Sequence, residues 1–157
     1  MFSIRKATVN DVDAIYDLII GIAKYEKMLD NVKATKNDLK VSLCDKEQAH
    51  VLLGVEDGKV IGFALYFYSF STFVGRANLY LEDLFVYEPY RGKGYGKELL
   101  KALASIAVDE HCERLDWVCL DWNKPSIDFY HSIGAKQMDE WLLFRLEKDA
   151  LKTFAKK

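Results

Sequence analysis

A chain of 157 residues is long enough for one domain with a single core, and a composition that is 50% hydrophobic and 13% aromatic excludes a disordered chain. The formal charge of −2 excludes the broad basic surface of a nucleic-acid-binding protein. No apolar run approaches the ~20 residues that cross a bilayer, so no membrane partner is expected.

The three cysteines, Cys44, Cys112 and Cys119, lie at spacings that match neither a zinc site nor a CxxC pair. An odd number of cysteines without a signal peptide indicates a reducing compartment in which the thiols are packed in the fold. We therefore expect a cytoplasmic protein without a metal site.

The N-terminal third of the chain predicts a strand followed by two helices. The stretch "FSIRKAT" reads as a short strand, and Asn10 is predicted to cap a helix that runs to about Tyr25. The apolar positions of this helix recur at helical spacing: Ile15, Leu18, Ile19 and Ile22. Thr35 and Asp38 resemble a capping box, which predicts a second short helix through Leu43.

The middle of the chain predicts three strands. In "HVLLGVEDGKVIGFALYFY" two apolar runs flank Asp57-Gly58, the favoured pair for a tight hairpin turn. The stretch "ANLYLEDLFVY" is the next strand. Strict alternation along it predicts that Leu79, Leu81 and Asp83 share one face, and that Tyr80, Glu82 and Leu84 share the other.

The C-terminal third predicts a helix from Gly96 to about Cys112 and then a buried strand, "RLDWVCLDW". A short helix follows at "KPSIDFYHSIG", with Pro125 in its first turn and Gly134 as a left-handed stop. The stretch "EWLLFRLEK" is predicted to close the sheet, before a charged C-terminal helix. The element order predicts a mixed α/β sheet with helices on its faces.

The most informative stretch is the glycine loop, residues 91–97, "RGKGYGK". Successive N–H groups at a strand-to-helix junction can converge on one point, and the helix N-terminus adds positive charge. The loop therefore predicts a site for a pyrophosphate, with charge-assisted help from Arg91 and Lys97. The spacing GxGxG matches neither the P-loop nor the dinucleotide fingerprint. The alternative is a flexible surface turn.

"YRGKGYGKELL" resembles the acetyl-coenzyme A signature R-x-x-G-x-G/A of the GNAT N-acetyltransferase superfamily. Further stretches resemble its spermidine/spermine (diamine) acetyltransferase branch: "AKYEKM", "YLEDLFVYEPYRGKGYG", "DWNKPSIDFYHSIGA" and "WLLFRLEK". The resemblance covers essentially the whole chain. It implies a single GNAT domain over 1–157, acetyl-CoA as the cofactor, a small-molecule amine as the acceptor, and a homodimer.

The resemblance also implies which residues bind the coenzyme. The main chain of one strand would pair with the pantetheine arm, although these residues are apolar enough to be simple core: Leu84, Phe85 and Val86. The glycine loop would hold the phosphates through Arg91, Gly92, Lys93, Gly94, Tyr95, Gly96 and Lys97. The short helix would add Asn123, Pro125, Ser126 and Tyr130. Asn123 reads equally as a helix cap.

Two residues are candidates for catalysis. Glu82 is a carboxylate in an apolar strand, and the matching glutamate of the family accepts the proton of the amine; the alternative is a solvated residue on the polar face of the sheet. Tyr130 matches the tyrosine whose hydroxyl lies beside the coenzyme sulfur and acts as the acid. Without the resemblance, a tyrosine that packs its ring is the better interpretation.

The resemblance places the acceptor amine near Tyr25, Glu26, Glu82 and Asp83; for "KYEKM" a solvated helix end is an equal alternative. Glu140 is a further contact, in competition with Asp139, because the family has a longer, glutamate-containing insertion here. His131 stands where the family has a lysine, which removes a charge near the phosphates.

We expect direct acetyl transfer to a primary amine of a polyamine or diamine. A lysine-like amino acid such as thialysine, a protein N-terminus, and a non-catalytic coenzyme A-binding role are the alternatives. Retention of both Glu82 and Tyr130 argues against the last.

Overall fold

The computed structural model describes residues 1–156 and divides the chain into two compact units, Met1–Val118 and Cys119–Lys157. The strands of the first unit are β1 (Phe2–Lys6), β2 (His50–Glu56), β3 (Lys59–Ser71), β4 (Arg76–Val86) and β5 (Leu115–Asp116). Its helices are α1 (Val12–Tyr25), α2 (Lys36–Leu39), continued by a π-helical turn at Lys40–Asp45, and α3 (Tyr95–Asp109). Short 3-10 turns lie at Val9–Asp11, Leu29–Asn31 and Glu88–Tyr90. The second unit holds α4 (Lys124–Ser132) and α5 (Lys148–Ala155).

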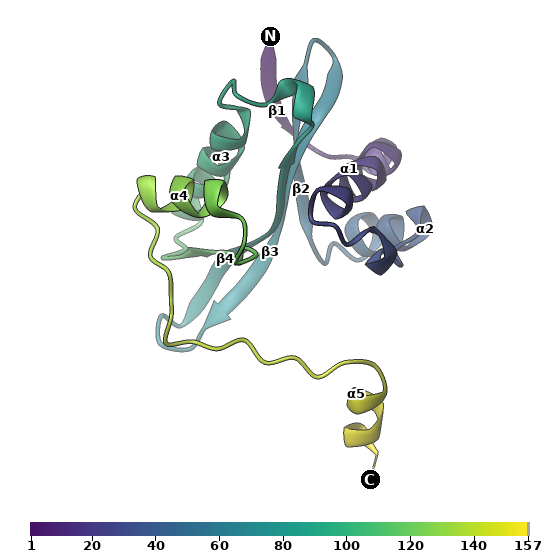
Figure 1. Cartoon of the computed structure of the whole chain (residues 1–157), viewed down its shortest axis with the longest axis vertical. Coiled ribbons are helices and arrows are strands. Elements are labelled where there is room, and N and C mark those ends of the chain that lie inside the picture. Colours follow the sequence, from purple (N-terminus) through teal and green to yellow (C-terminus); the bar gives the residue numbers. More distant parts are fainter. Residues whose placement is uncertain (157) are drawn as a thin grey trace. The chain divides into compact units, whose positions relative to one another are not determined.

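The first unit is a five-stranded sheet in the order β1-β2-β3-β4-β5. The first four strands are antiparallel and β5 runs parallel to β4, so the sheet is mixed, as predicted. The α1 and α2 helices lie on one face of this sheet and α3 lies on the other (Figure 1). The predicted hairpin turn is confirmed, since Asp57 and Gly58 both have positive φ, 50° and 80°.

The beginning of α1 differs from the prediction. Asn10 does not cap it: the residue at the N-cap position of α1 is Asp11, whose side chain makes no capping hydrogen bond to the helix. Thr8 instead caps the 3-10 turn Val9–Asp11 that leads into α1, since its hydroxyl accepts a hydrogen bond from the Asn10 amide at 3.3 Å and its amide donates to the Asp11 carboxylate at 2.7 Å. Arg5 also donates two hydrogen bonds, each 2.8 Å, to the Asp11 carboxylate. The capping box predicted for α2 is confirmed. The Thr35 amide donates to the Asp38 carboxylate at 2.9 Å, and the Asp38 amide donates to the Thr35 hydroxyl at 3.0 Å.

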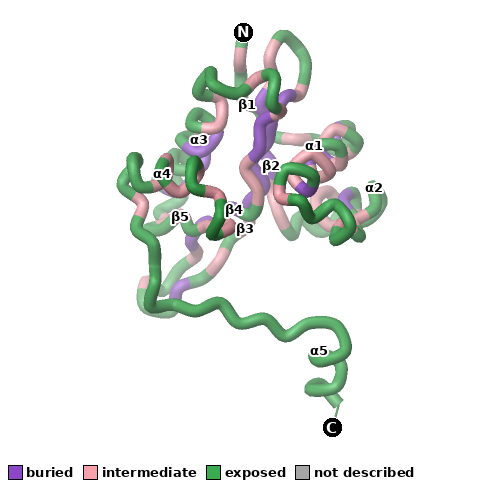
Figure 2. Tube along the Cα trace, in the orientation of Figure 1, coloured by how far each residue is buried: buried purple, intermediate pink, exposed green. Residues whose placement is uncertain are grey.

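Two apolar layers hold the helices to the sheet, and the buried residues gather in the strands and on the inner sides of the helices (Figure 2). The layer between the sheet and α1 is formed by Ile15, Leu18, Leu39, Val51, Leu53, Phe63, Leu65 and Phe85. The predicted stripe of α1 is thus confirmed: Ile15 and Leu18 are buried, and Ile19 and Ile22 pack against this layer. Buried leucines of α3 and β4 include Leu79, Leu99 and Leu103.

A β-bulge interrupts β4 where the acidic residues lie. Leu81 pairs with Tyr66 and Asp83 pairs with Leu65, so Glu82 is the extra residue between two successive partners. Paired residues share a face, and Leu65 and Tyr66 point to opposite faces. The prediction that Leu81 and Asp83 share a face is therefore wrong: Leu81 lies on the α3 side and Asp83 on the α1 side.

The β5 strand is shorter than predicted, because only Leu115–Asp116 pairs with β4, at Leu79 and Tyr80. The buried Asn78 side chain fixes the approach of this segment, since its oxygen accepts hydrogen bonds from the amides of Glu113 and Arg114 at 3.0 and 3.1 Å. The remaining apolar residues that suggested a longer strand do not pair, because an apolar run alone does not separate a strand from other packed backbone.

In the second unit, α4 agrees with the prediction: Pro125 lies in its first turn and Gly134 beyond its end has a φ of 90°. The segment 141–147 is not the predicted strand. Within the described part of this unit no strand accepts its main-chain groups, and its apolar side chains Trp141, Leu143 and Phe144 are 77–87% exposed. A helix, α5, follows it as expected.

Across residues 1–156, no helix combines the length and the apolar character that crossing a membrane requires. In the same part of the chain, no group of three or more His, Cys, Asp or Glu side chains is arranged to hold a metal ion. The three cysteines are half-buried, and none forms a disulfide within the described residues.

Candidate active site

The glycine loop exposes bare main chain on one side. Gly92 and Gly94 have φ values of 81° and 84°, the left-handed region that side chains disfavour. A Cβ atom added at Gly92, Gly94 or Gly96 would meet no heavy atom within 4 Å. The glycines are therefore not required by packing within the chain, and the space in front of them is open to a ligand.

The loop leads directly into the N-terminus of α3, where Gly94 is the capping residue. The first helical hydrogen bond runs from the Glu98 amide to the Gly94 carbonyl at 3.0 Å. The amides of residues 95–97 precede it and have no partner within the helix. Together with the helix dipole, these amides form a site suited to an anion.

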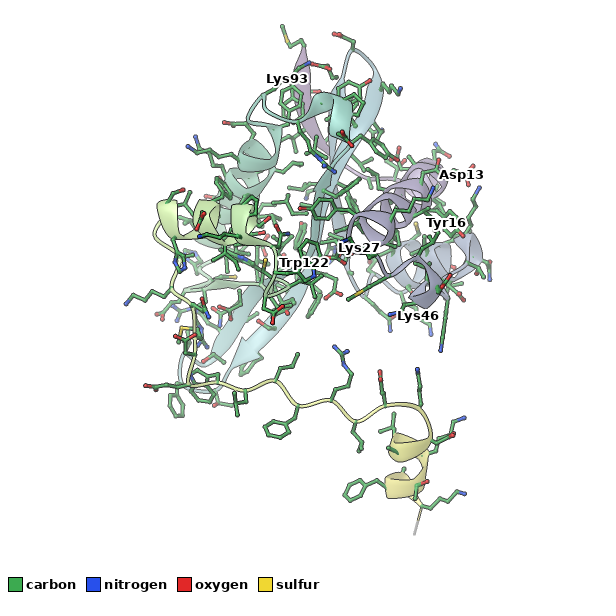
Figure 3. All side chains as sticks on the ribbon, viewed as in Figure 1. Asp13, Tyr16, Lys27, Lys46, Lys93 and Trp122 are labelled. Carbon is green, nitrogen blue, oxygen red and sulfur yellow. The ribbon has the colours of Figure 1, made fainter. Side chains whose placement is uncertain are left out.

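Two side chains of the loop anchor it to the first strands. The Tyr95 ring stacks on Phe2, with 4.0 Å between ring centroids, and its hydroxyl donates a hydrogen bond to Glu56, which raises the pKa of Tyr95. The Lys93 ammonium, labelled in Figure 3, lies 3.6 Å from the same carboxylate. Sequence reasoning missed Phe2 and Glu56, because only the sheet brings them to the loop.

Beyond Tyr80, the edge of β4 that faces away from β3 pairs with no strand of the described chain. The Tyr87 amide donates to the Ile61 carbonyl at 2.9 Å. Since hydrogen-bonded and non-bonded pairs alternate, Phe85 directs its main-chain groups toward β3, while Leu84 and Val86 direct theirs toward the open edge. Of the three residues predicted to bind pantetheine, only Leu84 and Val86 present main-chain hydrogen-bonding groups at the open edge of β4.

Arg91 lies between this edge and α1. Its Nε donates a hydrogen bond to the Val86 carbonyl at 2.7 Å. The central carbon of its guanidinium lies 5.2 Å from the ring centroids of both Phe85 and Tyr25. Lys97, the other predicted phosphate contact, is exposed in the first turn of α3.

Three carboxylates lie within electrostatic range of one another near the bulge that turns Asp83 toward α1. The charges of Glu82 and of Glu26, which directly follows α1, both act on Asp83, and Glu82 also acts on Glu26. Glu82 is exposed, while Asp83 and Glu26 are half-buried. None of the ion pairs formed between residues 1 and 156 includes any of the three, so this acidic group has no cation of its own in that range.

The pKa values of Asp83 and Glu26 are both raised above their ordinary values. Burial and then the charges of Glu82 and Glu26 raise the pKa of Asp83 to about 7. Burial and the charge of Glu82 also raise the pKa of Glu26. Two half-buried carboxyls that resist ionisation attract a cation, because a positive charge beside them relieves both penalties.

The remaining predicted residues lie in the second unit. Asn123 occupies the N-cap position of α4, although its side chain makes no capping hydrogen bond. Pro125 and Ser126 are in the first turn of α4, and Tyr130 is in its last turns with its ring 5.8 Å from that of Phe129. Asp139 and Glu140 are exposed in the irregular segment that follows.

A bare glycine loop at a helix N-terminus beside an open strand edge is suited to a phosphate-bearing coenzyme, and the nearby carboxylates are suited to a cationic ligand. The comparison with family models gives the class of protein. The model described as "Acetyltransferase (GNAT) family" matches residues 13–135. The chain belongs to this family, whose members use acetyl-CoA as the acetyl donor.

Curated relatives extend over nearly the whole chain. The chain is 37% identical to a thialysine N-epsilon-acetyltransferase from Bos taurus over 166 aligned positions, which cover 98% of this chain and 97% of that protein. It is 35% identical over 161 positions to the spermidine/spermine N(1)-acetyltransferase-like protein 1 of Homo sapiens, covering 96% of this chain and 23% of that protein.

The fold is that of the family. A solved structure of an integron cassette protein from the mobile metagenome of V. cholerae superimposes with a TM-score of 0.83 at 32% identity, over 99% of this chain and 98% of that one. The predicted GNAT fold, a mixed central sheet with helices on both faces, is thereby confirmed.

Proposed function

We propose that this acetyltransferase transfers the acetyl group of acetyl-CoA to a primary amine of a small polycationic substrate, a polyamine or diamine of the spermidine/spermine type. The observation that carries the proposal is that Glu26, Glu82 and Asp83, which lie within electrostatic range of one another, form no ion pair among the described residues. A chain of amines spaced by methylenes would supply several positive charges to these carboxylates.

The residues present fit the coenzyme. The main chain of residues 92–97 and Lys97 would hold the phosphates, because the space before the glycines is free of other protein atoms within 4 Å of each added Cβ. Leu84 and Val86 would pair with the peptide-like pantetheine arm along the open edge of β4. The resemblance adds Asn123, Pro125 and Ser126 to this set. Bound acetyl-CoA supplies the acetyl group as an activated thioester.

Within this proposal each acidic residue has a distinct task. An alkylammonium has a pKa near ~10.4 and must lose a proton before its nitrogen can attack. Glu82, exposed on the bulge, accepts that proton. Asp83 and Glu26 hold the remaining positive charge of the substrate, and Tyr25 lines the same end of α1.

Tyr130 is proposed as the acid. Its phenol donates a proton to the departing sulfur, so that the coenzyme leaves as a thiol. No covalent enzyme intermediate is needed, since the amine attacks directly when both substrates are bound.

Thialysine is the second candidate acceptor. The relative from Bos taurus carries thialysine in its name and matches the chain over almost its full length. Thialysine adds a carboxylate to the amine, and such a substrate requires a cation near the acceptor site. A polyamine has no such requirement, which is why we place it first.

A screen of thiol release from acetyl-CoA tests the proposal. The panel contains spermidine and spermine, short diamines, thialysine and ornithine, and an aminoglycoside. We expect the highest kcat/KM for a polyamine or diamine. A preference for thialysine by tenfold or more would replace the first candidate, and coenzyme binding without any transfer would support a purely binding role.

We also propose that the whole chain works as one domain and as a homodimer in the cytoplasm. The family match at 13–135 crosses the boundary between the two compact units.

The exposed apolar side chains of 141–147 are suited to burial against a second copy. The free thiols are consistent with a reducing compartment. Light scattering that gave the mass of one chain at micromolar concentration would contradict the dimer.

A further inference from the structure

We infer that Arg91 is a positioning residue that connects the coenzyme loop to the acceptor end of the site, rather than a direct phosphate contact. The inference rests on the proposed function, because that proposal makes residues 91–97 the coenzyme loop and Tyr25 part of the acceptor end. Arg91 contacts all three elements involved: its own loop, the edge of β4 and the last residue of α1.

The first contact is the hydrogen bond from the Arg91 Nε to the Val86 carbonyl, 2.7 Å long. This carbonyl is the last main-chain acceptor on the open edge of β4. The bond occupies it, so the Val86 amide and the main-chain groups of Leu84 remain for a ligand. Arginine is suited to this task because Nε donates sideways from a planar group, which the single terminal nitrogen of lysine does not reproduce.

The second contact is with two aromatic rings. The guanidinium carbon lies 5.2 Å from the ring centroid of Phe85 and 5.2 Å from that of Tyr25, within the ~6 Å range of cation–π attraction. Phe85 is itself fixed, since it packs edge-on against Tyr87 at 5.7 Å and closely against Gly21 of α1. Tyr25, the last residue of α1, is 40% exposed.

Arg91 therefore holds Tyr25 at the position beside Glu26 through this cation–π contact. A change in the loop is transmitted to Tyr25 through the Arg91 side chain, whose guanidinium is fixed by the hydrogen bond to Val86. The loop amides and Lys97 carry the phosphate interaction, while Arg91 determines how well the acceptor amine is received.

The test compares two substitutions that separate charge from shape. Arg91→Lys keeps the charge and loses the planar guanidinium, and Arg91→Gln loses the charge together with the Nε donor. We expect both variants to raise the KM for the amine fivefold or more and to leave the Kd of coenzyme A, measured by calorimetry, within about twofold. Arg76→Lys is the matched control, because the Arg76 Nε also donates to a carbonyl, that of His111 at 2.6 Å, away from the site. It should change neither constant.

A direct phosphate contact gives the opposite pattern. In that case Arg91→Gln weakens coenzyme binding tenfold or more, Arg91→Lys retains it, and the amine KM of Arg91→Lys stays at the wild-type value. That result would overturn the inference.

A double-mutant cycle tests the contact without substrate or coenzyme. Arg91→Lys, Tyr25→Leu and the double variant are unfolded in urea, and the two changes should be non-additive by roughly two- to fivefold in the unfolding equilibrium constant. Strict additivity would contradict the inference. If the wild-type protein acetylates no amine, the proposed function fails, whereas this cycle still decides whether Arg91 holds Tyr25.

Discussion

Asp83 on β4 lies within electrostatic range of Glu26, which follows α1: burial, then the charge of Glu82, then that of Glu26 raise the pKa of Asp83. The two residues are distant in the sequence and approach each other because the bulge at Glu82 turns Asp83 to the face of the sheet that carries α1. An unbroken strand would direct Asp83 to the α3 side, and the acidic group would not form.

Asp83→Asn should stabilise the unliganded protein above neutral pH. The pKa of Asp83 is about 7 in the folded protein and near ~4 in the unfolded chain. Between pH ~4 and ~7 the folded protein therefore keeps a proton on Asp83 that the unfolded chain has lost. Stability from this group is complete below pH ~4 and is lost as the pH rises through ~7. Removing it should gain on the order of 2 kcal/mol at pH 8, since surrounding water screens part of the shift.

Urea unfolding at pH 5 and pH 8 measures this effect. Asp109→Asn, an exposed change at the end of α3, is the control and should not alter the pH dependence. Equal stability of Asp83→Asn and wild type at pH 8 would show that Asp83 ionises at no cost.

Asp11→Asn should have the opposite dependence on pH. The hydrogen bonds from Arg5, which outweigh the cost of burial, lower the pKa of Asp11 to about 2. Its contribution is therefore present above pH ~4 and disappears as the pH falls through ~2. We expect a loss of about 2 kcal/mol in urea unfolding at pH 7, and almost none at pH 2. The same loss at both values would contradict a role for the charge.

Sequence patterns predicted the parts of this fold that depend on local chemistry. The Asp57-Gly58 turn, the box of Thr35 and Asp38 and the glycine loop before α3 each use residue types with a specific backbone preference. Elements that depend on a partner strand were predicted less well. The short β5 and the unpaired segment 141–147 contain the right residues for strands, but pairing decides whether a strand forms.

The candidate site was predicted unevenly for the same reason. The glycine loop is visible in seven consecutive residues, 91–97. Only the family resemblance grouped Asp83 with Glu26; the residue pattern alone did not, because their approach depends on a bulge that no single residue signals. The hydrogen bond from the Tyr95 hydroxyl to Glu56 could not be predicted either, because it depends on the register of β1 and β2.

Glu82→Gln should abolish the acidic limb of the pH profile of kcat/KM for the amine. Glutamine cannot accept the proton, so turnover should fall roughly 10²- to 10⁴-fold. Glu47→Gln, at an exposed turn before β2, is the control and should retain both the limb and the rate. An acidic limb that persists in Glu82→Gln would assign it to another group.

Tyr130→Phe should lower kcat roughly 10²- to 10⁴-fold and leave the Kd of coenzyme A within about twofold, because only a proton donor is lost. Tyr68→Phe, which removes a hydroxyl bonded to Glu110 at 2.6 Å, is the matched control for activity. Wild-type turnover of Tyr130→Phe at every pH would remove Tyr130 from catalysis.

The most direct measurement is the calorimetric affinity of coenzyme A for Gly96→Val. The Gly96 φ is not in the left-handed region and an added Cβ meets no protein atom within 4 Å, so the folded protein tolerates the change. Ala104→Val, exposed on the same helix, is the control because it introduces the same β-branched side chain away from the loop. The account predicts binding at least tenfold weaker for Gly96→Val and unchanged for Ala104→Val; wild-type affinity of Gly96→Val would contradict it.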